Sequence, residues 1–353
     1  MINLLKEKEN LWDYLSNQSK PIVIYGMGDG AIKIMNVCKD YGIEISEIFA
    51  SDDHVRGNTF LEYKVKTLAQ VQEKYDDFII LLAFAAFEEG LMNKIYTLAE
   101  KHELYAPDVP VFGSGLFTLE YIEENEIHFD FVYNKLSDDY SKKVYTNLLN
   151  FKVSGKIDYL KDISTTRSQD YTELLPLSDG ITYVDLGAYD GDTINEILSH
   201  NITPDRIIAF EPDPKNYRKL VNNTQEIPHV ELHNIGSYNC ATTLSFNNKA
   251  GRNSAFGSDG KHIEIPVNSV DNILNGSPAH YIKMDVEGAE YATILGCKET
   301  MVQYKPAMGI AAYHRNEDLF KLAELVLSIN PNYELYIRHN HYIPAWESIF
   351  YAI

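Results

Sequence analysis

Acidic side chains and glycines are interleaved in one short run, Asp185 to Thr193, that follows an apolar segment. Glycines let the backbone turn sharply and approach a ligand closely. About twenty residues later a second apolar segment ends in Glu211, and an acid at the end of the second strand of an open α/β sheet commonly binds ribose hydroxyls. Clustered carboxylates suit a ligand with hydroxyls and a positive centre better than a phosphate-rich one. These residues therefore predict a site for S-adenosylmethionine rather than for NAD or ATP.

The glycine run is expected to lie between the first strand and the first helix of a catalytic unit. Backbone N–H groups from Gly187 to Gly191 would face the methionine part of the cofactor, and the helix dipole would favour its carboxylate. The third strand of the unit would end beside the adenine. The alternatives are a glycine turn that only permits tight packing and a solvated strand end at Glu211. The predicted cofactor-binding residues are Asp185, Gly187, Ala188, Tyr189, Asp190, Gly191, Asp192, Thr193, Glu211, Pro212, Asn234, Ile235 and Gly236.

A third apolar run ends in Asp285 and Glu287, and a glycine then begins a helix. Chemistry in open α/β sheets takes place beyond the carboxyl ends of the strands, so these acids are predicted beside the transferred methyl group. His314 follows another predicted strand and is the best candidate for a general base, because its ordinary pKa lies near neutrality. The alternative roles are a structural histidine, and a Glu287 that only complements a helix dipole. A Mg²⁺ ion on Asp285 and Glu287 is a further alternative, but no metal is expected because no third carboxylate is apparent.

A second glycine turn lies near the N-terminus, where Gly26, Gly28 and Ala31 follow an apolar strand and precede a helix. Asp52 follows the next strand. This context is typical of a nucleotide-binding fingerprint, although a single fingerprint is a weak signal. A ligand here would be a nucleotide or a nucleotide sugar; dimerisation, or support for the following segment, is the alternative. The rival function is therefore an NAD(P)- or nucleotide-sugar-binding protein whose second unit is structural or inactive.

Strands and helices alternate in two parts of the chain, which predicts two doubly wound Rossmann-like α/β domains. The predicted boundaries are 1–112 for the first domain, 113–176 for a helical connector and 177–353 for the catalytic domain. The connector has apolar residues at three- and four-residue steps, as amphipathic helices do. With 353 residues the chain has ample material for buried cores.

Charge and composition exclude some partners. The formal net charge is −20, with 51 acidic and 31 basic residues. This balance argues against binding to nucleic acid or to an anionic membrane surface. The three cysteines, Cys38, Cys240 and Cys297, lack the spacing of a zinc site and predict reduced thiols in a cytoplasmic protein. The N-terminus has no signal-peptide pattern. We expect a small-molecule or glycan acceptor as partner; a homo-oligomer is compatible with the sequence.

The ordered motifs resemble those of FkbM-type methyltransferases. The resemblance spans about residues 177–353 and rests on the runs 185–193, 210–212, 282–290, 313–319, 336–339 and 347–352. It implies a class I methyltransferase fold with a seven-stranded sheet, S-adenosylmethionine as methyl donor, and O-methylation of a hydroxyl of a sugar, glycan precursor or natural product. The chain departs from the commonest pattern at Asn340, where a second histidine followed by serine is frequent, and this departure bears on acceptor specificity.

Overall fold

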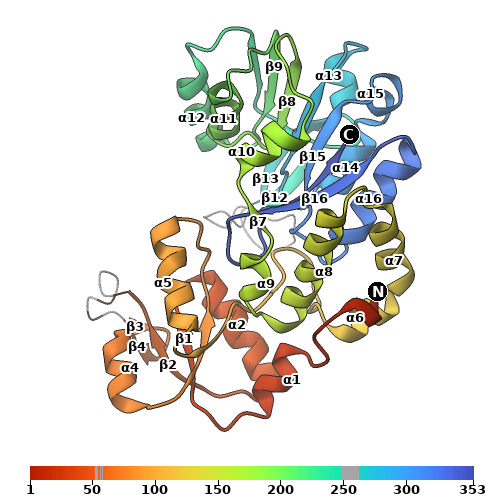
Figure 1. The fold of residues 1–353 in the computed structure, drawn as a ribbon. Helices are drawn as coiled ribbons and strands as arrows, with labels where there is room; N and C mark the ends of the chain where they lie inside the picture. Colours follow the sequence, from red (N-terminus) through yellow and green to blue (C-terminus); the bar gives the residue numbers. More distant parts are fainter. Residues whose placement is uncertain (52–54, 56, 58, 248–261) are drawn as a thin grey trace.

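The computed structural model describes residues 1–51, 55, 57, 59–247 and 262–353. Asp52, which the sequence singled out, lies outside the described residues. Figure 1 shows two main sheets with a helical segment between them: N-terminal strands form the first sheet, and most strands from β7 onward form the second.

The first sheet has four parallel strands in the order β2-β1-β5-β6. Its strands are buried on both faces, because alternate residues of β1 and β5 belong to different core clusters. Helices α1 and α2 pack on one face, and α4 and α5 pack on the other. The elements are η1 (Ile2–Leu4), α1 (Leu11–Ser16), β1 (Ile22–Tyr25), α2 (Asp29–Asp40), β2 (Ile45–Phe49), β3 (Thr59–Phe60), β4 (Tyr63–Lys64), α4 (Leu68–Lys74), β5 (Ile79–Leu82), α5 (Glu89–Ala99) and β6 (Glu103–Tyr105).

The segment between the sheets is mainly helical. It consists of α6 (Leu119–Glu124), α7 (Glu126–Lys135), α8 (Asp139–Ser154), α9 (Asp158–Lys161), β7 (Ser164–Thr165), α10 (Arg167–Gln169) and the π-helical turn η2 (Asp170–Leu174). Helix α8 begins at an N-cap, Asp138, whose carboxylate accepts from the N–H of Ser141, and it ends at Gly155 in the left-handed conformation. Apolar residues of α7 and α8 share one core cluster with both sheets.

The second sheet has eight strands rather than the expected seven, in the order β10-β9-β8-β14-β15-β17-β16-β7. The eighth strand is β7, where the connector pairs Ser164 and Thr165 with His339 and Asn340. The sequence did not reveal it, because a two-residue strand has no periodicity to detect. The other strands are β8 (Thr182–Leu186), β9 (Arg206–Phe210), β10 (Val230–His233), β14 (Tyr281–Met284), β15 (Ala307–Ala311), β16 (Leu335–Asn340) and β17 (Ser348–Ala352). Strand β17 runs antiparallel to both of its neighbours, and the remaining pairs are parallel.

Helices cover both faces of this sheet. The face that carries Tyr183 and Tyr281 packs against η2, α11 and α12, and the opposite face packs against α8 and α13 to α16. A small sheet, β11-β13-β12, follows β10. The remaining elements are α11 (Asp192–Ser199), α12 (Pro214–Thr224), β11 (Gly236–Ser237), β12 (Thr242–Asn247), β13 (His262–Asn268), α13 (Val270–Leu274), α14 (Glu290–Leu295), α15 (Lys298–Gln303) and α16 (Asp318–Ile329). Among the helices that the structure describes, none is long and apolar enough to cross a membrane.

Candidate active site

The turn after β8 depends on its glycines. Gly187 and Gly191 have φ angles of +79° and +88°, and a Cβ atom on Gly187 would lie 1.9 Å from the carbonyl oxygen of Asp285. The turn can therefore pass close to the end of β14 only because residue 187 has no side chain. Tyr189 between them also has a positive φ, +49°, a conformation that costs free energy in a residue other than glycine.

The backbone N–H groups of this turn are mostly engaged within the protein. Those of Gly187 and Ala188 donate to the carbonyl of Phe210, and that of Gly191 donates to the carbonyl of Ala188. The N–H of Tyr189 donates to Glu211 Oε2. The expectation that the N–H groups from Gly187 to Gly191 face a ligand is therefore wrong for these four residues. The turn holds the ends of β8, β9 and β14 together instead.

Asp185 lies at the end of β8, and its side chain is fully buried. Its carboxylate accepts from the hydroxyl of Thr193 at 2.5 Å and lies 3.3 Å from Lys283 Nζ. Lys283 also donates to the carbonyl of Gly187 at 2.8 Å. Burial alone would lower the pKa of Lys283, but the charges of Asp185 and Asp285 raise it, so the lysine stays charged. This ion pair ties the glycine turn to the neighbouring strand.

Glu211 ends the second strand of the sheet and is almost completely buried. Its oxygens accept from the N–H groups of Tyr189 and Asp213 at 2.9 and 2.8 Å, which leaves further lone pairs for the hydroxyls of a ribose. Burial raises the pKa of Glu211 to about 7. The chain turns sharply after Glu211, because Asp213 caps α12 by accepting from the N–H groups of Lys215 and Asn216, and Pro214 occupies the first helical position.

The residues predicted beside an adenine lie after β10. The side-chain amide of Asn234 donates to the carbonyls of Glu211 and Pro212 at 2.8 and 3.2 Å, so it braces the end of β9. Ile235 is half-buried and packs against the main core, and Gly236 begins β11. In the glycine turn itself Asp190 is half-buried and Asp192 is exposed in the first turn of α11. Cofactor contacts of these residues stay a prediction.

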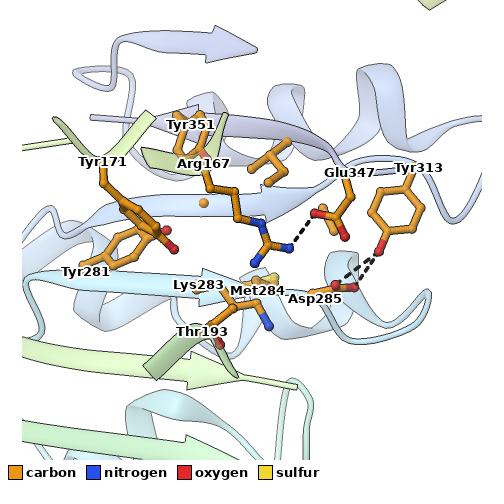
Figure 2. A pocket seen from close by; sticks show the side chains of 13 residues that line it. Arg167, Tyr171, Thr193, Tyr281, Lys283, Met284, Asp285, Tyr313, Glu347 and Tyr351 are labelled. Atoms are coloured by element: carbon orange, nitrogen blue, oxygen red, sulfur yellow. Dashed lines mark hydrogen bonds and ion pairs between the residues drawn. The ribbon is translucent and has the colours of Figure 1, made fainter. Parts of the chain in front are cut away.

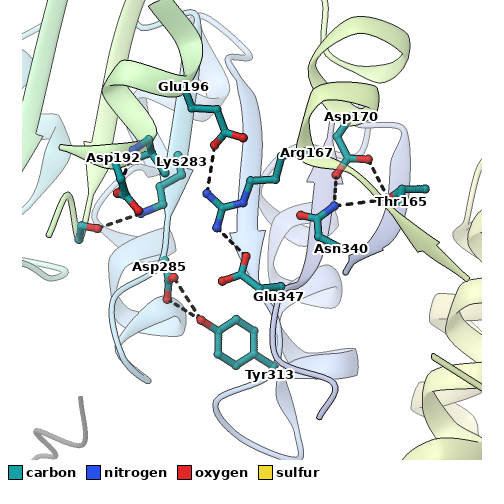
Figure 3. A network of polar contacts seen from close by, with 12 residues as sticks. Thr165, Arg167, Asp170, Asp192, Glu196, Lys283, Asp285, Tyr313, Asn340 and Glu347 are labelled. Atoms are coloured by element: carbon teal, nitrogen blue, oxygen red, sulfur yellow. Dashed lines mark hydrogen bonds and ion pairs between the residues drawn. The ribbon is translucent and has the colours of Figure 1, made fainter. Parts of the chain in front are cut away.

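A narrow pocket opens at the middle of the sheet, on the face covered by η2 (Figure 2). Arg167 of α10 reaches into it and bridges two acids, Glu347 at 2.6 Å and Glu196 at 3.2 Å (Figure 3). Lys283, Asp285 and several tyrosine rings complete the lining. The connector therefore supplies a cation to the second sheet. The sequence contained no motif around Arg167, and only the fold brings it here.

Asp285, Glu287 and His314 come together at the carboxyl ends of β14 and β15. His314 Nε2 lies 3.4 Å from Asp285 Oδ1 and 3.5 Å from Glu287 Oε2. The imidazole is almost completely buried, whereas the side chain of Glu287 is 47% exposed. Asp285 also accepts from the hydroxyl of Tyr313 at 3.1 and 3.2 Å (Figure 3). The fold thus brings together the three residues that were predicted to act near the methyl group.

The sequence reasoning missed Glu290, which lies in the first turn of α14. Its side chain is 1% exposed, and its Oε1 lies 2.9 Å from His314 Nδ1. Oε1 also accepts from the N–H groups of Val286 and Gly288 at 3.0 and 3.3 Å. The sequence did show an acid five residues after Asp285, at the start of a predicted helix. An acid at that position is also expected simply because it interacts favourably with the helix dipole.

The charge state of His314 differs from the expectation. Burial lowers its pKa, but Glu290, Glu287 and Asp285 together raise it well above the ordinary value. His314 is therefore protonated near neutral pH when its site holds nothing else, and a protonated imidazole is not a general base. Conversely, burial raises the pKa of Asp285, but the charges of His314 and Lys283 outweigh it and lower the pKa, which keeps the carboxylate ionised.

Packing explains two of the glycines in the N-terminal turn, Gly26 and Gly30. A Cβ atom on Gly26 would lie 2.5 Å from the ring of Phe84, and one on Gly30 would lie 2.4 Å from the carbonyl oxygen of Ala83. Gly28 has a φ of +130° and caps α2, and Ala31 is fully buried beneath the turn. Ligand binding by Gly26, Gly28 and Ala31 stays a prediction.

Residues 185–343 match the family model described as the methyltransferase FkbM domain. These residues belong to the FkbM methyltransferase family. The FkbM methyltransferase of Methylobacillus flagellatus KT has 21% sequence identity and a TM-score of 0.76, and the match covers 99% of this chain and 95% of that one. Because the match covers nearly the whole chain, the first sheet and the connector are part of the fold shared with that FkbM protein.

Two other solved structures match about half of the chain. Aeropyrum pernix fibrillarin, in complex with S-adenosyl-L-methionine, has 13% identity, a TM-score of 0.34 and coverage of 53% of this chain and 72% of that one. The putative methyltransferase SMU.1697c from Streptococcus mutans, in complex with SAH, has 13% identity, a TM-score of 0.30 and coverage of 53% and 96%. These scores are too low to carry an inference about the FkbM domain. A search of curated proteins found no significant match.

Proposed function

We propose that this FkbM methyltransferase uses S-adenosylmethionine to methylate a hydroxyl group of a sugar, a glycan precursor or a natural product. The observation that carries the proposal is the juxtaposition of two groups of residues at one sheet edge. The glycine turn with Glu211 lies at the ends of β8 and β9, and the Asp285–His314 cluster lies at the end of the adjacent β14.

The residues around the glycine turn fit the cofactor. Glu211 offers carboxylate oxygens at the strand end where ribose hydroxyls are commonly bound, and two backbone N–H groups fix its orientation. The Asp185–Lys283 pair fixes the turn beside β14. When bound, the cofactor supplies an electrophilic methyl group on a sulfonium.

The role of the chain is to align the acceptor oxygen with that methyl group, since positioning supplies much of the rate of an in-line displacement. Asp285 is ionised, partly exposed and oriented by Tyr313, so it suits an acceptor hydroxyl that donates a hydrogen bond. The exposed Glu287 lies on the solvent side of the same cluster. The sugar or natural-product nature of the acceptor rests on the FkbM resemblance alone.

Calorimetric titration of S-adenosylmethionine and S-adenosylhomocysteine into the full chain tests the donor. We expect micromolar binding of both, and weaker binding by Glu211→Ala, whereas the exposed Glu226→Gln serves as the matched control. No binding by the wild-type protein would overturn the proposal. A screen with a radiolabelled methyl donor and a panel of sugars, nucleotide sugars and amines then tests the acceptor; transfer to amines alone would refute O-methylation.

A further inference from the structure

Three side chains of metal-ligating type converge at the end of β14. Asp285, Glu290 and His314 each offer one ligand atom, and these atoms all lie within 4.8 Å of one another. Ligand atoms that lie about 2.0–2.2 Å from one ion are about 3–3.5 Å apart, so a small inward movement would bring all three into contact with a common ion. Imidazole nitrogen and carboxylate oxygen together suit Mn²⁺, Fe²⁺ or Zn²⁺.

Unpartnered buried atoms in the same cluster point independently to a missing ligand. Glu290 Oε2 and His314 Nδ1 are both buried and have no hydrogen-bond partner. Nδ1 forms an ion pair with Glu290 Oε1 at 2.9 Å, although the geometry of this contact falls short of a hydrogen bond. The distances from Nε2 to Asp285 and Glu287, 3.4 and 3.5 Å, are also long for hydrogen bonds. Buried polar atoms without partners are costly and call for a bound water or ion.

The backbone is shaped to present these oxygens. Glu287 has a φ of +55° and Gly288 a φ of +89°, and this tight loop turns Glu290 back toward Asp285 and His314. The N–H groups of Val286 and Gly288 hold Glu290 Oε1, which leaves Oε2 as the oxygen available to a ligand. Strained conformations of this kind persist where the surrounding structure imposes them, and they cluster at functional sites.

We propose that Asp285, Glu290 and His314 bind one divalent metal ion, with the exposed Glu287 at the mouth of the site. Two buried or half-buried carboxylates and a neutral imidazole would balance the charge of the ion. The rival explanation is a closed ion cluster in which His314 keeps its proton and its positive charge offsets the carboxylates around it. The metal ion would take the place of that proton.

The metal site does not depend on the methyl donor, but its role in the reaction rests on the proposed function. Asp285 lies where an acceptor hydroxyl is expected, so the ion could bind that hydroxyl and lower its pKa. The acceptor class would then be hydroxyls able to coordinate a cation, such as vicinal diols of a sugar.

The test is a titration of the full chain with Mn²⁺ alone, after removal of metals with a chelator and without S-adenosylmethionine. Electron paramagnetic resonance of the free ion should show one saturable site, and ¹⁴N modulation of the bound Mn²⁺ should reveal an imidazole ligand. We expect Glu290→Gln and His314→Gln to weaken Mn²⁺ binding by about tenfold or more, in line with losses seen at metal sites. Glu226→Gln, which changes an exposed acid elsewhere, should leave binding unchanged.

Absence of saturable binding by the wild-type chain, or binding without ¹⁴N modulation, would overturn the proposal in favour of the closed ion cluster. The ¹⁴N modulation is measured on the wild-type chain, so the test remains even if a variant fails to fold. Circular dichroism of each variant checks folding. A protein that binds Mn²⁺ through an imidazole but not S-adenosylmethionine would confirm the metal site and refute the proposed donor.

Discussion

The chain makes a strand–glycine–helix turn twice, and the two turns differ in the charges that surround them. In the turn at Gly26 to Ala31 the acid is Asp29, whose side chain is 55% exposed, and the glycines accommodate Phe84 and a carbonyl oxygen. In the turn at Gly187 to Gly191 the preceding Asp185 is fully buried beside Lys283, and Glu211 is buried against the backbone of the turn. Glycines alone therefore indicate a tight connection, whereas buried charges at the strand ends mark the candidate site.

The two turns should differ most in the free energy of unfolding that is lost when a glycine is replaced by alanine. Gly187→Ala places Cβ 1.9 Å from the Asp285 carbonyl oxygen at a φ of +79°, and backbone cannot move away as a side chain can. We expect a loss of more than about 5 kcal/mol in the free energy of unfolding, or no folded protein. Gly28→Ala, with no atom within 4 Å of its Cβ, should cost only backbone strain, about 1–3 kcal/mol. Urea denaturation of both variants measures the contrast; equal losses would contradict it.

The second largest loss of stability is expected when the ion pair between Asp185 and Lys283 is broken. Asp185→Asn removes the ion-pair partner of the mostly buried Lys283, which should reduce stability by about 3–5 kcal/mol as well as weaken cofactor binding. The double variant Asp185→Asn/Lys283→Met should recover part of the stability but not the binding. Thermal unfolding and calorimetry separate the two effects. If Asp185→Asn binds the cofactor with wild-type affinity, Asp185 has only a structural role.

A smaller effect is expected from the protonation of Glu211. Its pKa in the free protein is about 7, raised by burial above the ordinary value, so the carboxylate that binds ribose hydroxyls is formed as the pH rises through 7. The affinity for S-adenosylmethionine should therefore fall about tenfold from pH 8 to pH 6. The Glu211→Gln variant should bind S-adenosylmethionine more weakly than the wild type at pH 8. Its affinity should no longer show the tenfold fall between pH 8 and pH 6. An unchanged pH profile in the variant would exclude Glu211 as its source.

The smallest effect on cofactor affinity is expected from a substitution in the first glycine turn. Gly28→Ala should change the affinity for S-adenosylmethionine less than about twofold, because the first turn lies in a different sheet from Glu211. The same variant tested with reduced nicotinamide dinucleotide, by fluorescence enhancement on binding, examines the rival function. Enhancement in the wild type that is lost in Gly28→Ala would give the first turn a ligand of its own.

Much of the secondary structure could be predicted, because apolar runs that end in acids or glycines mark buried parallel strands. The strand β7 could not, since two residues carry no pattern and its pairing depends on where the connector meets β16. Asn340, the position that departs from the family pattern, donates to the buried Asp170 at 2.8 Å. Its neighbour His339 is also buried, and burial lowers its pKa to about 4, which keeps it neutral.

The sequence by itself determined the glycine turn after β8, the strand-end acids Asp185, Glu211 and Asp285, and the membership of residues 185–343 in a methyltransferase family, because these follow from local residue order. Only the tertiary structure decided which charges meet. Arg167 of α10 reaches Glu196 and Glu347, and Glu290 of α14 reaches His314 in the loop after β15. The pKa of a buried group depends on such partners and on burial, and both are properties of the packed chain rather than of any segment.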